Sequence, residues 1–210
     1  MIPLLHDFAG ATVLVFGGGS VGARKARRFA REARVVVVSP AFEGEFGGAD
    51  LVRAAPAPGD VAGWVRRADP ALVVAATDDD AVNDAAGRAA REAGALVNRA
   101  DRAGGRDPGS VVVPATVRDD PVVAAVATGG RSPALSRYLR EQIEEDIEGA
   151  GAMAELTADL RAELAERGVA PDDRRAALRA VVRSDRVWTG LRTGTPNPRA
   201  EAESVIEDHT

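Results

Sequence analysis

Cysteine is absent from this sequence, which excludes disulfide bonds, zinc–thiolate sites, iron–sulfur clusters and cysteine nucleophiles. Histidine is scarce: His6 and His209 lie near opposite ends of the chain and do not form a helical pair of metal ligands. We interpret both histidines as non-ligands and predict that the protein holds no metal.

Long hydrophobic runs and excess positive charge are also missing. No apolar run approaches the ~18 residues that a membrane-spanning helix needs, and the N-terminus lacks the charged and apolar regions of a secretion signal. The formal net charge is −5 and Lys25 is the only lysine, which argues against general nucleic-acid binding. We therefore expect a cytoplasmic protein that binds neither nucleic acid nor a membrane.

What the chain does have is a glycine-rich turn between a strand and a helix. A short apolar run ends at Phe16, the pattern Gly17-x-Gly19-x-x-Gly22 follows, and a helical pattern comes next. This arrangement is typical of a dinucleotide phosphate-binding loop, in which Gly17 permits a tight turn, Gly19 lets backbone amides approach a pyrophosphate and Gly22 lets the helix pack close to its strand. The first helical residues, Ser20-Val21, offer unpaired N–H groups to the anion.

Short apolar runs alternate with longer helical patterns over the first hundred residues, as in a doubly wound parallel sheet. The predicted strands are residues 12–16, 34–38, 50–54, 71–76 and 95–98. The predicted helices are residues 20–32, 59–67 and 79–93. The sequence therefore predicts an α/β fold with a Rossmann-type domain over residues 1–113.

The pattern changes after that domain. Residues 110–113 and 122–127 are predicted strands whose join is too short for a helical crossover, so we expect an antiparallel pair. Ser132-Pro133 predicts a capped helix that runs to about Ile147. Helical patterns over 153–167 and 171–183 predict a helical C-terminal part. The expected boundaries are 114–149 for the strands and helix, 150–193 for the helical part, and 194–210 for a loose tail.

Polar residues follow the ends of three predicted strands, at the edge where open α/β sheets bind ligands. The second strand ends at Ser39-Pro40-Ala41, without the acid that usually binds adenosine ribose. Either a hydroxyl or backbone groups bind the ribose there, or the turn touches nothing, and NAD is favoured over NADP only weakly.

The fourth predicted strand is followed by Thr77, for which we predict contact with the cofactor, and by residues 78–80, of which at least one is expected to cap the next helix. The fifth strand delivers Asn98 and Asp101 to the same edge. Asp101 is either a general base beside a bound nicotinamide or a turn aspartate bonded to its own backbone, and the residues alone leave both readings open.

Together these segments resemble the siroheme synthase N-terminal family, the precorrin-2 dehydrogenases, some of which are also sirohydrochlorin ferrochelatases. The resemblance covers residues 1 to about 145. It rests on the glycine loop, Ala-Ala-Thr-Asp-Asp with Asn83, Asn98-x-x-Asp101, Val-Pro114-Ala115 and Thr128-Gly-Gly-x-Ser-Pro.

The resemblance implies an NAD-dependent oxidation of precorrin-2 to sirohydrochlorin. In that reading Asp101 is the essential aspartate, which takes a proton or orients the macrocycle, and Thr128 lines the substrate cavity. The family also implies a homodimer, joined through the two antiparallel strands and the helix after Pro133. No methyltransferase-sized extension follows, so we expect a separate enzyme to supply precorrin-2.

A tetrapyrrole with many carboxylates needs positive groups close by, because screening limits electrostatic influence to ~8–10 Å. Arginine suits this role, since it binds carboxylates through two parallel hydrogen bonds. The candidates near the expected cavity are Arg118, Arg131, Arg137 and Arg140. Arg137 and Arg140 could equally form the solvated face of a helix.

The chain departs from the family in residues 102–113, a longer, glycine-rich loop without an aromatic residue. This loop contains Asp107, a second candidate for the base. Two alternatives stay open: an NAD-binding regulatory module of the potassium-uptake type, and a chelatase in which Asp101 accepts pyrrole protons. The regulatory modules usually carry an acid after the second strand and lack the Thr-Gly-Gly-x-Ser-Pro segment.

Overall fold

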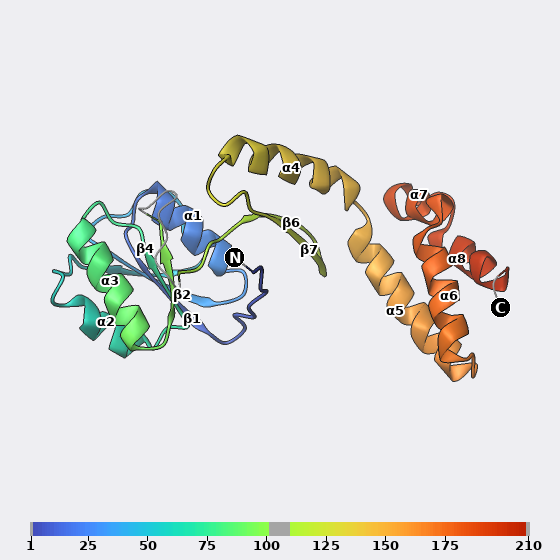
Figure 1. The fold of residues 1–210 in the computed structure, drawn as a ribbon, viewed down its shortest axis with the longest axis horizontal. Coiled ribbons are helices and arrows are strands. Elements are labelled where there is room, and N and C mark those ends of the chain that lie inside the picture. The colour runs from blue at the N-terminus through green and yellow to red at the C-terminus, as the bar shows by residue number, and fades with distance from the viewer. Residues whose placement is uncertain (1, 101–109, 209–210) are drawn as a thin grey trace. The chain divides into compact units, whose positions relative to one another are not determined.

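The computed structural model describes residues 2–100 and 110–208 and divides the chain into two compact units, residues 1–113 and residues 114–210 (Figure 1). Asp101 and Asp107 lie outside the described residues. Each unit has its own hydrophobic core.

The first unit is a parallel sheet with helices on both faces. Its strands are β1 (Thr12–Phe16), β2 (Arg34–Ser39), β3 (Asp50–Arg53), β4 (Leu72–Ala75) and β5 (Leu96–Arg99). Its helices are α1 (Ser20–Phe29), α2 (Val61–Ala68) and α3 (Asp80–Glu92). The strand order is β3-β2-β1-β4-β5 and every pair is parallel, which confirms the predicted Rossmann-type sheet.

The strands are rich in valine because helices cover both faces of the sheet, so that side chains on either face are buried. Alternate residues of β1 enter different cores: Leu14 and Phe16 pack with residues of α2 and α3, whereas Val13 and Val15 pack with residues of α1. In Figure 1, α1 accordingly covers one face and α2 and α3 cover the other. The small side chains of α1 and α3 let these helices lie close to the sheet.

Residues 110–113 do not form the first strand of the antiparallel pair, so that prediction is wrong. Ser110 makes a parallel bridge with Val97, and the Val111 amide donates a 2.7 Å hydrogen bond to the Val97 carbonyl. Val111 and Val113 pack against the core on the α1 side of the sheet. The half-buried apolar run instead extends the parallel sheet beside β5.

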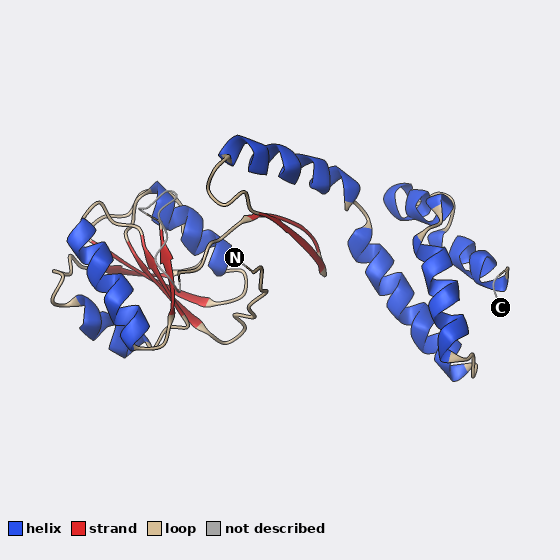
Figure 2. Cartoon of the chain, viewed as in Figure 1, coloured by secondary structure: helices blue, strands red, loops and turns tan. Residues whose placement is uncertain are grey.

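The second unit begins with an antiparallel hairpin of β6 (Ala115–Asp119) and β7 (Val122–Val126), followed by α4 (Pro133–Asp146). The Ser132 hydroxyl accepts a hydrogen bond from the Leu135 amide, and Pro133 occupies the first turn, which confirms the predicted helix start. Figure 2 shows α4 running along the hairpin.

Four further helices form a cluster at the C-terminal end (Figure 2). They are α5 (Ala150–Glu166), α6 (Pro171–Val182), α7 (Asp185–Thr193) and α8 (Pro198–Glu207). The expectation of a loose tail from residue 194 is wrong, because Ala202 and Ile206 of α8 are buried in the helical core. Asn197 caps α8 and Pro198 follows at its first position, the same signal that predicted α4.

None of the helices in the described part of the chain combines the length and the apolar character needed to cross a membrane.

Candidate active site

The glycine loop connects β1 to α1 at the centre of the sheet. Strand β1 lies between β2 and β4, where the strand order reverses and ligands of such folds bind. Gly17 has a φ of 115°, and a Cβ added there would lie 2.2 Å from the Ala76 carbonyl oxygen. A Cβ on Gly22 would lie 2.0 Å from the Gly17 oxygen, whereas no atom of the described residues lies within 4 Å of one on Gly19. The loop thus packs tightly at both ends and leaves open space at Gly19.

The start of α1 carries no group that competes with an anion. Gly19 is its N-cap and provides no side-chain hydrogen bond, and the first turn holds no acidic residue. The N–H groups of the first turn, including those of Ser20 and Val21, have no intrahelical acceptor, and the helix dipole adds partial positive charge there. This end of the helix therefore favours a phosphate group.

The start of α3 is different, since the chain itself supplies the anion. The Asp79 carboxylate accepts hydrogen bonds from the amides of Ala81 and Val82 at 2.8 and 3.2 Å, and Asp80 lies in the first turn. The expectation that one of these aspartates caps the helix is confirmed. Of these two helix starts, that of α1 has no side-chain cap from the described residues, whereas that of α3 has one.

Gly18 is a position that the sequence analysis missed. A Cβ there would lie 2.1 Å from the Ala41 carbonyl oxygen and 2.8 Å from the Ser39 hydroxyl oxygen, and the Glu43 amide donates to the Gly18 carbonyl at 2.8 Å. The turn Ser39-Pro40-Ala41 is therefore pressed against the glycine loop. The three residues predicted to face the adenosine ribose do lie beside the loop predicted to bind the pyrophosphate.

Thr77 belongs to a loop that is held by its own chain. Its hydroxyl and its amide both donate to Oδ1 of Asn83, at 2.8 and 3.1 Å, and Nδ2 of Asn83 donates to the Thr77 carbonyl at 2.8 Å. Asn83 is fully buried. The Thr77-x-Asp-Asp-x-x-Asn83 pattern therefore encodes a structural loop beside Gly17, and cofactor contact by Thr77 stays a prediction.

Asn98, near the end of β5, presents an unsatisfied buried acceptor. Its side chain is only 5% exposed, and Nδ2 donates to the Val111 carbonyl at 2.8 Å. Oδ1 has no hydrogen-bond partner within the described residues. Because a buried acceptor without a donor is unfavourable by about 1–3 kcal/mol, this atom is suited to receive an N–H group from a ligand.

Thr128, predicted to line the substrate cavity, holds the loop before α4. Its hydroxyl lies 2.8 Å from that of Ser136 and accepts from the Ser132 amide at 3.4 Å. Gly129 and Gly130 have φ values of 68° and 81°, which explains why two glycines stand in this turn.

The candidate substrate arginines lie in the same unit but in different environments. Arg118 lies 3.7 Å from Asp120, and the backbone amide of Arg131 donates to the Thr128 carbonyl at 3.2 Å. Arg137 and Arg140 donate to Glu141 and Glu144 at 3.0 and 2.6 Å. The bond from Arg137 holds the pKa of Glu141 below its usual value. These last pairs match the alternative that the two arginines form a solvated helix face.

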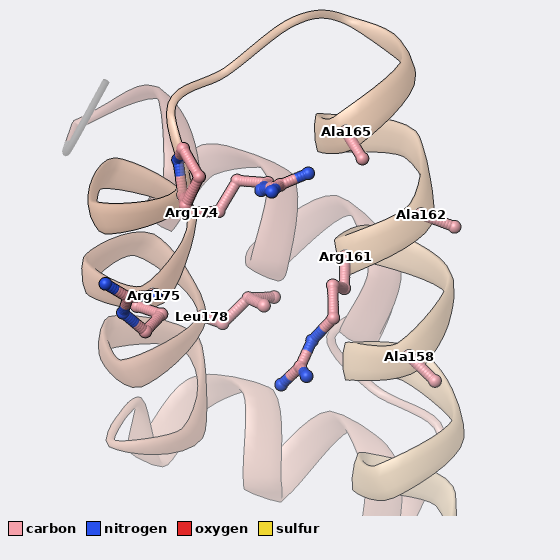
Figure 3. A pocket seen from close by; sticks show the side chains of 8 residues that line it. Ala158, Arg161, Ala162, Ala165, Arg174, Arg175 and Leu178 are labelled. Carbon is pink, nitrogen blue, oxygen red and sulfur yellow. The ribbon is translucent and has the colours of Figure 1, made fainter.

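A basic groove that the sequence analysis did not predict lies between α5 and α6. It encloses about 470 Å³, and Figure 3 shows Arg161 reaching from α5 towards Leu178 on α6. Arg174 and Arg175 also line it, and Arg175 pairs with Asp172. In the described residues, no group of three or more His, Asp or Glu side chains is arranged to hold a metal ion.

Comparison with known proteins places these features in a family. A family model described as putative NAD(P)-binding matches residues 4–115. A precorrin-2 dehydrogenase from Methanosarcina barkeri is 31% identical, and the alignment covers 99% of this chain and 94% of that protein. A siroheme synthase from Stutzerimonas stutzeri is 34% identical over 99% of this chain. The chain belongs to the precorrin-2 dehydrogenase and siroheme synthase family.

The similarity includes the fold, and it covers only part of the longer siroheme synthases. A solved structure described as SirC, precorrin-2 dehydrogenase, superposes with a TM-score of 0.69 at 23% identity and covers 99% of this chain and all of that one. The chain spans 43% of the S. stutzeri siroheme synthase, so less than half of that longer protein has a counterpart here.

The residues present fit the dinucleotide that the family name implies. The space at Gly19 and the uncapped start of α1 suit a pyrophosphate, and the unsatisfied Oδ1 of Asn98 suits a buried donor. What the sequence analysis missed is how much of the surrounding pattern is structural: Gly18 packs against Ala41 and Ser39, and Asn83 holds the Thr77 loop.

Proposed function

We propose that this protein oxidises precorrin-2 to sirohydrochlorin with NAD as the electron acceptor. The similarity to the M. barkeri precorrin-2 dehydrogenase, which spans nearly the whole of both chains, carries this proposal. The glycine loop with its open helix start supports it, because an oxidoreductase of this kind must hold a dinucleotide at the carboxyl edge of the sheet.

The first unit binds the cofactor in this proposal. The glycine loop from Gly17 to Gly22 holds the pyrophosphate through the amides at the start of α1, including those of Ser20 and Val21, with Gly19 leaving the space, and residues 39–41 face the adenosine ribose. Thr77 and Asn98 border the nicotinamide side, where Oδ1 of Asn98 accepts an N–H donor. Bound NAD supplies the acceptor for a hydride that leaves a ring carbon of the substrate.

A carboxylate takes the proton that leaves with the hydride. We assign this role to Asp101, and Asp107 is the second candidate. Replacement of the true base lowers the rate on the order of 10²–10⁴-fold. Single-turnover rates of Asp101→Asn and Asp107→Asn distinguish the two, and loss of activity in Asp107→Asn alone would reject Asp101 as the base.

The substrate side is assigned to the second unit. Thr128 shapes the loop beside the substrate, and Arg118, Arg131 and Arg137 bind its rim carboxylates. Among these, Arg131 is the strongest candidate, since it is exposed and makes no side-chain ion pair with the described residues. Cytoplasmic location remains a prediction.

We also propose a homodimer built through the β6–β7 hairpin and α4. Helix α4 buries none of its residues within the chain, and Leu135 and Tyr138 are 47% and 57% exposed. A two-stranded sheet is marginally stable by itself, so both the hairpin and the helix gain from a second copy.

The decisive assay mixes the purified chain with precorrin-2 and NAD under anaerobic conditions and follows sirohydrochlorin and NADH. Both products form if the proposal is correct, and no turnover with NAD or NADP would reject it in favour of a regulatory dinucleotide-binding module. Adding Fe²⁺ or Co²⁺ to the sirohydrochlorin formed tests chelation as a separate activity.

A further inference from the structure

An arginine without an acidic partner lies beside the end of β2. Ser39, the last residue of that strand, is in register with Arg53 at the end of β3, so both side chains point to the same face of the sheet. Nη1 of Arg53 donates a 2.9 Å hydrogen bond to the Pro40 carbonyl, and its guanidinium carbon lies 5.6 Å from the centre of the Phe42 ring. The guanidinium is therefore held at the turn that follows β2.

The charge of this guanidinium is not neutralised by the chain. Arg53 is exposed and makes no ion pair with a carboxylate in the part of the chain that the structure describes. The bond to Pro40 uses one of its five N–H donors, so the others are available. The first carboxylate after the strand is that of Glu43, which lies beyond Phe42 in the sequence.

This arrangement bears on the adenosine half of the dinucleotide site. The turn that contains Ser39 and Ala41 packs against Gly18, so a dinucleotide held by the glycine loop brings its adenosine ribose to this turn. In such sites an acid at the strand end binds the free 2′-hydroxyl and repels a 2′-phosphate, whereas a nearby arginine accommodates the phosphate. Here the acid is replaced by the hydroxyl of Ser39, which can donate to a phosphate oxygen, and Arg53 is adjacent.

We propose that Arg53 and Ser39 bind a 2′-phosphate and that the protein therefore takes NADP as well as NAD. The inference rests on the dinucleotide site of the proposed function and adds the group that determines its cofactor range. No step of the dehydrogenation depends on it.

Binding of four ligands to the full chain tests this inference. Isothermal titration with NAD, NADP, ADP-ribose and 2′-phospho-ADP-ribose measures the 2′-phosphate contribution with and without the nicotinamide. We expect NADP to bind within about tenfold of NAD. Arg53→Gln raises the Kd for NADP and for 2′-phospho-ADP-ribose by roughly tenfold or more, as expected for loss of a charge-assisted hydrogen bond. It changes the Kd for NAD and for ADP-ribose by less than about threefold.

Three further variants make the test specific. Arg53→Lys keeps the positive charge and restores part of the NADP affinity. Ser39→Asp introduces the missing acid and shifts the preference to NAD. Arg34→Gln is the matched control, because it removes another exposed arginine, at the opposite end of β2, where Arg34 pairs with Asp50 at 3.0 Å. It leaves NADP binding unchanged.

The outcomes separate this inference from the proposed function. If NAD binds and NADP is weaker by more than roughly a hundredfold, about 2.7 kcal/mol, the inference is wrong and the proposed function stands. If Arg53→Gln and Arg34→Gln raise the Kd for NADP equally, Arg53 contributes only to the overall charge of the protein, and the inference is wrong. If neither dinucleotide binds, both proposals fail.

Discussion

The carboxyl edge of the parallel sheet and the hairpin–α4 segment differ in the kind of group that they leave uncovered. Strand β4 is fully buried, and at the carboxyl edge of the sheet the groups without a partner among the described residues are polar: the amides of the α1 start and Oδ1 of Asn98. The exposed large apolar residues of this unit lie elsewhere, in the N-terminal segment and on β3: Ile2, Leu4, Leu5 and Leu51. In the hairpin–α4 segment the hydroxyls of Thr128 and Ser132 are hydrogen-bonded within the chain, whereas the large side chains of Leu135 and Tyr138 on α4 are exposed.

This difference indicates which kind of partner each region is suited to bind. Unsatisfied amides beside open space suit a small anionic ligand, whereas apolar side chains on a helix without buried residues suit another protein surface. In our proposal the first unit therefore provides the cofactor site, and the second provides the subunit interface. The following variants test this division.

The largest effects are expected in the glycine loop. Gly17→Ala places a Cβ 2.2 Å from the Ala76 backbone at a φ of 115°, so it lowers the free energy of unfolding by several kcal/mol and abolishes NAD binding. Gly19→Ala is the matched control, because its Cβ meets nothing within 4 Å. This variant keeps the wild-type stability in urea unfolding but raises the Kd for NAD by about tenfold or more, because the added methyl group fills the space for the pyrophosphate. Equal stability loss in both variants would contradict this reading.

The next largest effect is on assembly. Leu135→Asp puts a charge on the exposed apolar face of α4, and we expect it to convert a dimer of twice 21.8 kDa into a 21.8 kDa monomer in light scattering. Glu144→Lys changes the charge at an exposed position on the opposite face of α4 and leaves the dimer intact. If the wild-type chain is monomeric at micromolar concentration, the proposed homodimer is wrong.

A smaller effect is expected where the chain satisfies its own polar groups. Asn83→Ala removes the buried amide that holds the Thr77 loop, and lowers the free energy of unfolding by about 1–3 kcal/mol. Thr77→Val removes only the hydroxyl, and its effect is about 1 kcal/mol. Because that hydroxyl is bonded to Asn83, Thr77→Val changes the Kd for NAD by less than about threefold. A loss of affinity much greater than this would make Thr77 a direct cofactor ligand.

The smallest effect concerns Lys25 on α1, whose pKa is lowered from 10.5 to about 8 by burial and by repulsion from Arg28 and Arg24. Between these pH values the unfolded chain holds a proton that the folded chain has lost, so stability rises as the pH increases. Lys25→Met removes this rise and stabilises the protein at pH 7 by on the order of 1 kcal/mol. Urea unfolding across this pH range provides the measurement, and an unchanged slope in the variant would contradict the assignment.

The sequence predicts the parallel sheet well because its signals are local. Valine runs, glycine turns and the Ser132-Pro133 cap each specify a structure within a few residues. The Val111–Val113 run was misplaced because apolar residues cannot reveal whether a strand pairs with β5 or with a later hairpin. The strand that does form the hairpin, Ala115–Asp119, is less apolar and alternates with polar residues.

In the candidate site, too, the features that depend on local sequence were predicted, and those that depend on contacts between distant segments were not. The turn at Gly17 follows from its spacing, whereas the contact of Gly18 with Ala41 depends on two strands separated in the sequence. The pairing of Ser39 with Arg53 depends on strand register, which no local pattern gives. The loop that was expected to hold the base, with Asp101 and Asp107, lies outside the described residues.

The central claim is that the open polar edge of the first unit binds the electron acceptor for a tetrapyrrole oxidation. The most direct test is to measure NADH and sirohydrochlorin in one anaerobic reaction, with the wild-type chain and with Gly19→Ala. We predict that the wild type forms the two products in equal amounts, and that the folded variant forms both slowly at the same NAD concentration. Sirohydrochlorin formed without NADH, or an undiminished rate in the variant, would contradict the account.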